Sequence, residues 1–132
     1  MPRGISPGGR FYAIVHDCSG ERDTVIVGSN VSNRATSYTI EVYNAFGELL
    51  AAETETSEEP YASTFYNLTS MIYEASEEVD WQYAWGLCIV RPLVYGPSGD
   101  LFALAVEMYV EEELVDVYQV TPSSYGTGGT DF

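Results

Sequence analysis

Alternating hydrophobic and polar residues predict β-strands along most of the chain. Residues 37–44 place Tyr38, Ile40 and Val42 on one face of an extended segment, which is the period-2 pattern of a half-buried strand. Residues 101–110 alternate in the same way. Shorter apolar runs predict five further strands, at residues 11–16, 24–27, 48–55, 81–90 and 114–120.

Turn-forming residues separate these runs. Residues 17–20 and 96–100 are rich in Gly, Ser, Asp and Pro, and Glu111-Glu112-Glu113 forms the tip of a last hairpin. Pro92 has no backbone N–H to donate to a ladder. We therefore expect any continuation of the strand through residues 93–95 to bend or to lie at a sheet edge.

One segment changes its period and predicts a helix. Apolar residues follow helical spacing, with Ser63 or Thr64 as the capping residue at the start. Glutamates toward the C-terminal end oppose the helix dipole, so we expect a short helix near residues 64–79. Its apolar face comprises Leu68, Met71, Ile72, Ala75 and Val79.

About seven strands and one short helix favour a mainly β fold. We predict an antiparallel β-sandwich, jelly-roll or immunoglobulin-like, over residues 11–120. The first ten residues hold three Gly, two Pro and two Arg, a composition typical of an extended arm. Residues 121–132 are rich in Gly, Ser and Thr and predict a flexible C-terminal tail.

Three runs of the N-terminal half resemble a known family. Phe11-Tyr12-Ala13-Ile14-Val15, then residues 24–30 and 38–43, are similar to the opening of the sensory rhodopsin transducer family of small bacterial β-sandwich proteins. The resemblance covers residues 11–50. It implies an oligomeric β-sandwich without known enzymatic activity, of a kind in which one member is the partner of a membrane photoreceptor. No binding residue is carried over from that family.

The charge restricts the partners. The chain has 20 acidic residues against five arginines and no lysine, for a net charge of −15. Nucleic acid and anionic membranes are therefore excluded as direct partners, because both are bound through cationic side chains. We see neither the apolar core of a signal peptide nor a run long enough to cross a bilayer, and the compartment stays open.

The positive charge gathers at the N-terminus. Residues 1–34 hold four arginines and three acids, a net of +1, whereas residues 35–132 hold one arginine and 17 acids, a net of −16. Arg3 and Arg10 of the arm are therefore candidates for docking on the acidic body of a neighbouring copy. The acidity itself suits either an assembly surface or a saline habitat, where salt screens self-repulsion.

The residues capable of chemistry favour no reaction. His16 and Cys18 would need a third, orienting group to form a nucleophilic pair, and spacing supplies none. Cys18 and Cys88 allow one disulfide or two buried thiols. The acidic runs lack the order of a calcium loop, and no zinc spacing, phosphate-binding loop or nucleophile elbow is present. We expect no enzyme, cofactor or metal.

Aromatic residues are the remaining candidates for binding. Trp81, Tyr83 and Trp85 alternate, so one strand face would present all three rings. We expect a structural or adaptor subunit whose partner is itself and in addition another protein. A carbohydrate or small-ligand module using the three rings, and an outer component of a virus particle, are the alternatives.

Overall fold

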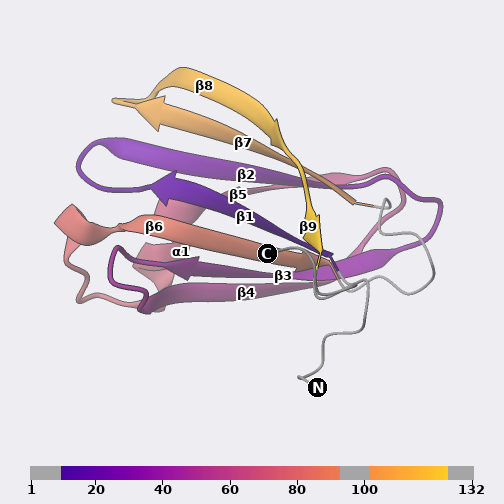
Figure 1. Ribbon diagram of the computed structural model, residues 1–132, viewed down its shortest axis with the longest axis horizontal. Coiled ribbons are helices and arrows are strands. Elements are labelled where there is room, and N and C mark those ends of the chain that lie inside the picture. The colour runs from indigo at the N-terminus through magenta and orange to yellow at the C-terminus, as the bar shows by residue number, and fades with distance from the viewer. Residues whose placement is uncertain (1–9, 93–101, 125–132) are drawn as a thin grey trace.

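Two antiparallel sheets form the body of the molecule in a computed structural model that describes residues 10–92 and 102–124 (Figure 1). Every strand pairing in this part of the chain is antiparallel, so the predicted β-sandwich is confirmed. The strands are β1 (Arg10–Asp17), β2 (Arg22–Asn30), β3 (Thr36–Tyr43), β4 (Leu49–Glu58), β5 (Ser63–Asn67), β6 (Trp85–Pro92), β7 (Phe102–Val110), β8 (Glu113–Val120) and β9 (Ser123–Ser124).

The strand order brings distant segments together. One sheet has the order β4-β3-β6-β1-β9 and the other β5-β2-β7-β8. The pairs β2–β5 and β3–β6 are those that the immunoglobulin fold also places side by side. Here, however, β7 and β8 extend the sheet of β2, and β1 lies beside β6. The first sheet is therefore completed by the N-terminal strand, and the second by the C-terminal hairpin.

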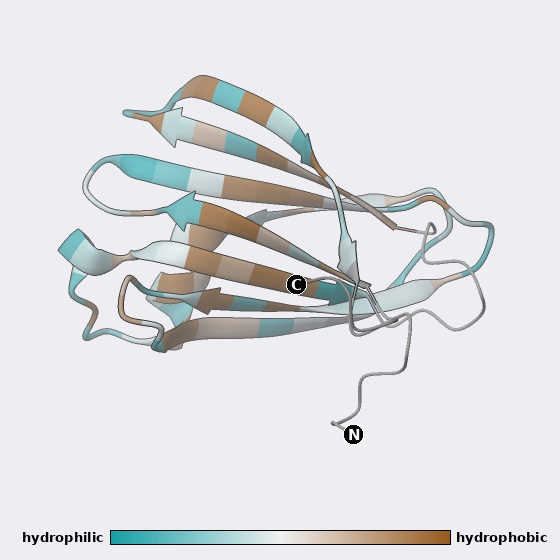
Figure 2. Ribbon diagram, viewed as in Figure 1, coloured by the Kyte–Doolittle hydropathy of each residue, from teal (hydrophilic) through white to brown (hydrophobic). Residues whose placement is uncertain are grey.

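The core lies between the sheets, as the alternation predicts. Tyr38, Ile40 and Val42 are buried, and so are the alternate residues of β7 that face them. Figure 2 shows brown, hydrophobic segments concentrated in the middle of the central strands. Two buried phenols are hydrogen bonded: Tyr12 donates to the Phe102 carbonyl at 2.6 Å and Tyr38 to the Tyr66 hydroxyl at 3.3 Å.

The helix is shorter than predicted. Helix α1 spans Leu68–Ala75, and Leu68, Met71 and Ile72 are buried as the spacing predicts. The rest of the predicted face is wrong, because Ala75 is exposed and Val79 lies beyond the end of the helix. The expected start and the caps Ser63 and Thr64 are wrong, because these residues belong to β5. Asn67 is the N-cap, and its side chain accepts a hydrogen bond from the Ser70 backbone N–H at 3.0 Å.

The predicted strand over residues 81–90 is also partly wrong. Its first residues form a 3₁₀ helix, η1 (Trp81–Tyr83), and β6 begins only at Trp85. The strand is central, between β3 and β1, and runs past the predicted end at residue 90 to include Pro92, the ladder partner of Tyr38. The proposed continuation through residues 93–95 lies outside the described residues. Alternating aromatics here therefore mark a helical turn followed by a strand.

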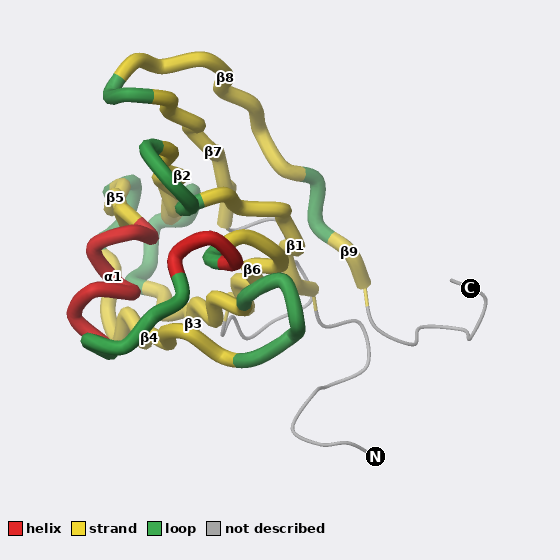
Figure 3. The backbone as a smooth tube through the Cα atoms, turned by 90° about the vertical axis from the view of Figure 1, so that its left-hand side faces the viewer, coloured by secondary structure: helices red, strands yellow, loops and turns green. Residues whose placement is uncertain are grey.

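The two long sides of the sandwich differ. Between the edge strands β4 and β5, helix α1 packs against β4, β2 and β5; we call this the closed side. The opposite side, between β9 and β8, we call the open side. Figure 3 shows α1 on one side of the molecule and the β8–β9 segment on the other. The short connection Thr121–Pro122 joins the two sheets on the open side.

Candidate self-association surface

The three aromatic residues of the predicted platform do not share one face. Trp81 is half-buried against the core and stacks on Tyr73 of α1, with ring centroids 4.7 Å apart. Tyr83 stacks on Phe46 in the β3–β4 turn at 4.9 Å. Both rings thus hold η1 to neighbouring elements. Trp85, on β6, is 44% exposed.

Trp85 is part of an apolar area on the outer face of the five-stranded sheet. Val15 and Leu87 are cross-strand partners in the β1–β6 ladder, and Trp85 lies two residues from Leu87 on the same face. All three side chains are exposed. We call Val15, Trp85 and Leu87 the outer patch. It forms because odd-numbered residues of both strands face away from the core.

Polar groups border the outer patch. Glu41 of β3 pairs with Arg91 of β6, and the Tyr43 hydroxyl donates to Glu41 Oε1 at 3.1 Å. Desolvation of its hydroxyl raises the pKa of Tyr43, and the nearby Glu41 carboxylate raises it further. These groups satisfy one another, so they stabilise the sheet surface.

Strand β8 exposes four large apolar side chains. Every residue from Glu113 to Gln119 is exposed, although the strand is paired along its length with β7. A strand in a sandwich normally buries one face. Here residues on both faces of the strand meet solvent. The exposed apolar side chains are Leu114, Val115, Val117 and Tyr118.

The outer edge of β8 is open as well. Within residues 10–92 and 102–124, β8 pairs with β7 alone and ends its sheet (Figure 1). Such an edge presents backbone N–H and C=O groups that a further strand can pair with. A bulge near Leu114 and the charges of Glu113 and Asp116 restrict this pairing. They leave the stretch from Asp116 to Val120 regular.

The sequence contains a signal for β8 that period-2 reasoning missed. Polar residues recur at every third position, Glu113, Asp116 and Gln119, with apolar residues between them. A strand with this spacing puts apolar side chains on both of its faces. Such a pattern indicates a strand that either packs against other elements on both faces or exposes an apolar face to solvent.

Of the two arginines in the proposed arm, the structure describes Arg10 but not Arg3. Arg10 belongs to β1 and is the ladder partner of Ser124 in β9. The paired strands therefore include Arg10 and Ser123–Ser124, which the sequence analysis assigned to the arm and the tail. Arg3 and the rest of both segments lie outside the described residues.

His16 and Cys18 form a buried pair whose protonation state opposes nucleophilic chemistry. His16 is fully buried; its Nε2 lies 2.7 Å from the Tyr43 carbonyl oxygen and its Nδ1 3.6 Å from Cys18 Sγ. Since a carbonyl only accepts, Nε2 carries the proton, and Nδ1 accepts from the thiol. Burial lowers the pKa of His16 and raises that of Cys18 to about 11. The pair is therefore neutral, and the sulfur is a thiol.

The two cysteines are separate thiols. Cys88 is opposite Ile14 in the β1–β6 ladder. The Cys18 backbone N–H instead donates to the carbonyl of Ala84, which directly precedes β6. Both are free and buried. In the described part of the chain, no three His, Cys, Asp or Glu side chains are grouped so that they hold a metal ion.

Comparisons with known proteins add no assignment: no family model matches the chain, and neither curated proteins nor solved structures give a significant match. The resemblance of residues 11–50 to sensory rhodopsin transducers therefore stays a prediction. Among the residues that the structure describes, no helix has the length and apolar character needed to cross a membrane.

Proposed function

We propose that the protein is a non-enzymatic structural or adaptor subunit that associates with copies of itself through its β-sandwich. The observation that carries the proposal is strand β8, whose residues from Glu113 to Gln119 are all exposed while four of them are large and apolar. Clusters of exposed apolar side chains on a folded surface mark interaction sites. The buried, neutral state of the His16–Cys18 pair supports a role without catalysis.

Net charge sets the conditions under which copies associate. Each chain carries −15, so approach of two copies is opposed by long-range repulsion. The Debye length falls from about 10 Å at 0.1 M salt to about 3 Å at 1 M salt. Association through apolar strands is therefore expected to strengthen as salt is added. A contact held by arginines and carboxylates would weaken under the same change.

Sedimentation velocity on the full chain, at 0.1 M and 2 M NaCl, tests the proposal. We expect a species heavier than the 14.6 kDa monomer that becomes dominant at high salt. A monomer under both conditions and at high protein concentration would overturn self-association. Removing residues 1–9, which leaves the Arg10–Ser124 pairing in place, tests the arm. An unchanged assembly would exclude Arg3 from the contact.

The exposure of Trp85 favours a second candidate, a carbohydrate or small-ligand module. An indole on a flat strand face, beside Leu87, is the kind of surface on which a sugar ring stacks. Glycan-array binding that is lost in Trp85→Ala and kept in Tyr83→Ala would support this candidate. Absence of glycan binding by the full chain would contradict it.

A further inference from the structure

We propose that His16 is an acid-sensitive latch, which holds one end of the sandwich closed at neutral pH and releases it when the imidazole takes up a proton. This is the end, at the left of Figure 1, where β1 and β3 finish and β6 begins. The latch belongs to the single subunit and does not depend on the proposed self-association. Its basis is the burial of His16 and the hydrogen bonds at both ring nitrogens.

His16 connects three strands of one sheet. It lies opposite Gly86 in the β1–β6 ladder, and its Nε2 donates to the carbonyl of Tyr43, one residue past the last pair of the β3–β6 ladder. The backbone can approach here because position 86 is glycine: a Cβ would lie 2.6 Å from the Asn44 carbonyl oxygen. The imidazole therefore joins β1 to β3 at the point where β3 and β6 stop pairing.

Both hydrogen bonds require the neutral imidazole. The Tyr43 carbonyl accepts from Nε2, which leaves Nδ1 as an acceptor for the Cys18 thiol at 3.6 Å. A proton on Nδ1 would turn this nitrogen into a donor that faces a sulfur, which accepts only weakly. It would also place a positive charge on a fully buried side chain, and an unpaired buried charge is strongly unfavourable.

The nearest carboxylate does not offset this charge. Asp17 favours the protonated form of His16, but its Oδ1 already accepts from the backbone N–H and the hydroxyl of Ser19. Its Oδ2 lies 3.7 Å from Arg22. Burial lowers the pKa of His16, while the bond to Tyr43 and the charge of Asp17 oppose this shift without cancelling it.

The other elements packed at this end supply no counter-ion. Asp23 of β2 and Glu41 of β3 act electrostatically on the thiols of Cys18 and Cys88, rather than on the imidazole. The side chains that α1 buries are apolar. Within the described residues, no salt bridge links His16 to a carboxylate. The protonated ring is therefore stable only where it reaches water.

Release of the latch affects a defined set of contacts. Once the imidazole moves to solvent, its bonds to Tyr43 and Cys18 are lost together. The Cys18 backbone N–H, which donates to the Ala84 carbonyl at 2.8 Å, is next in the same segment. We therefore expect the Cys18 amide to exchange with solvent through this local opening, while β2 and β7 stay paired.

The direction of the pH response follows from proton linkage. In the open state His16 titrates near its ordinary pKa of 6.5, whereas the closed state stays neutral to lower pH. The open state thus binds the additional proton, and its population rises as the pH falls below about 6.5. If the closed state takes up no proton above pH 5.5, the opening equilibrium increases about tenfold between pH 7.5 and pH 5.5.

Hydrogen exchange of the full chain at these two pH values tests the latch. The protection factor of the Cys18 amide, which corrects for the intrinsic pH dependence of exchange, should fall about tenfold. The Val106 amide, in a strand paired on both sides, reports global unfolding and should be more strongly protected at pH 5.5. Equal protection of the two amides would mean that His16 is exposed only by global unfolding, and this would overturn the latch.

His16→Gln removes the titration and keeps a donor. The Gln side-chain amide can donate to the Tyr43 carbonyl in place of Nε2 and takes up no proton in this range. Protection of the Cys18 amide should then be the same at both pH values. Asp116→Asn, at an exposed position of β8, is the control and should keep the full response. A pH dependence that persists in His16→Gln would assign it to another group and contradict the proposal.

Proton NMR of the unmodified chain gives a readout that needs no variant. His16 is the only histidine, so a single imidazole signal reports its protonation. We expect a midpoint near pH 6.5 in the urea-unfolded chain and a clearly lower midpoint in the native protein. A native midpoint at or above that of the unfolded chain would overturn the latch, even if His16→Gln fails to fold.

Discussion

The closed and open sides of the sandwich use apolar residues in opposite ways. On the closed side, α1 inserts Leu68, Met71 and Ile72 into the core between β4 and β5. On the open side, β8 leaves its apolar side chains in solvent. Burying a side chain of this size contributes about 1.5 to 3 kcal/mol to folding. The closed side therefore stabilises the subunit, whereas the exposed apolar side chains of β8 contribute little to folding.

The largest expected effect is on the free energy of unfolding, and it is tested by truncating one apolar side chain on each side of the sandwich. Ile72→Ala removes a fully buried side chain under α1 and should lower the free energy of unfolding by about 3 kcal/mol. Leu114→Ala, on exposed β8, should lower it by less than about 0.5 kcal/mol. Urea unfolding of dilute protein at low salt measures both values for the monomer. Equal losses for the two variants would show that the sides do not differ as described.

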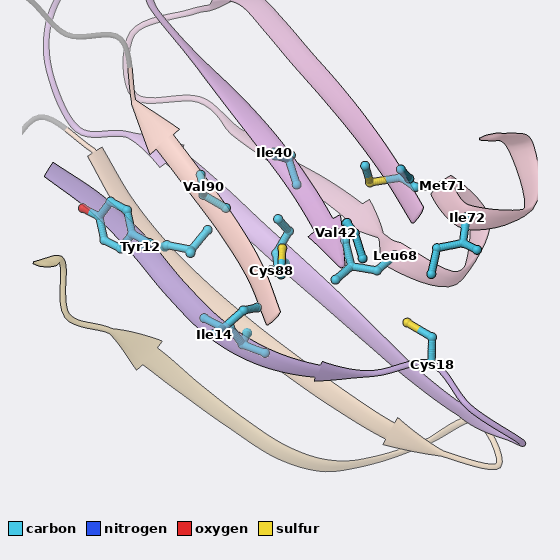
Figure 4. Packing of buried hydrophobic residues seen from close by; sticks show 14 of the residues in the cluster. Tyr12, Ile14, Cys18, Ile40, Val42, Leu68, Met71, Ile72, Cys88 and Val90 are labelled. Carbon is cyan, nitrogen blue, oxygen red and sulfur yellow. The ribbon is translucent and has the colours of Figure 1, made fainter. Parts of the chain in front are cut away.

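The second prediction uses Cys18 as a reporter of the closed side. Cys18 belongs to the buried cluster that also contains Leu68 and Ile72 of α1 (Figure 4). The rise of its pKa from 9.0 to about 11, two units, lowers the thiolate fraction about 100-fold at pH 8. Native protein should therefore react with iodoacetamide at least 100-fold more slowly than the urea-unfolded chain.

Opening of α1 should release this protection selectively. We expect Ile72→Ala to speed Cys18 alkylation more than that of Cys88, which lies in the middle of β6. Leu114→Ala should change neither rate. Mass spectrometry of tryptic fragments follows each cysteine separately. Fast modification of Cys18 in the unmodified native protein would contradict both the burial and the raised pKa.

The third prediction concerns the start of α1. Asn67 accepts the Ser70 N–H and satisfies one of the otherwise unpaired donors of the first turn. Asn67→Ala should therefore cost about 1 kcal/mol of stability in urea unfolding. Asn33→Ala, at an exposed position outside every helix and strand, is the matched control and should be nearly neutral. A neutral Asn67→Ala would mean that α1 depends on burial alone.

The core and most strands could be predicted because alternation reports burial directly. Tyr38, Ile40 and Val42 are buried as expected, and the apolar helical spacing correctly selected Leu68, Met71 and Ile72. Strand β5 was missed since it is short and leads without a turn into α1. The alternation of aromatic residues 81, 83 and 85 led to the wrong prediction of a single strand. Residues 81 and 83 belong to η1, where their rings stack on Tyr73 and Phe46, which are distant in sequence.

The surface was harder to predict than the core for a physical reason. Whether β8 buries a face depends on how far the opposite sheet extends, and this is set by pairings such as β1–β9 between segments far apart in the chain. Local composition does not encode that extent. Trp85 is exposed, as a binding residue must be, but its binding role stays a prediction. The exposure of Val117 was not predicted.

The smallest effect concerns the tip of the β7–β8 hairpin on the open side. Glu111 and Glu112 have φ of 51° and 70°, a left-handed conformation that two-residue hairpins require and that Asn-Gly adopts with less strain. Replacing the pair with Asn-Gly should raise stability by about 1 kcal/mol or less, since the added freedom of Gly in the unfolded chain offsets part of the relief.

The Asn-Gly replacement also removes two negative charges near Glu113, and this loss of repulsion can itself raise the stability. The double variant Glu111→Gln, Glu112→Gln removes the same charges and keeps the strained backbone, so it should gain less in urea unfolding. The Glu111 backbone N–H bond to the Glu21 carbonyl, 2.8 Å, survives in both variants. If the two gain equally, charge rather than backbone strain governs the tip. Because the tip precedes the paired stretch of β8, neither variant should change the salt at which copies associate by more than the lost charge accounts for.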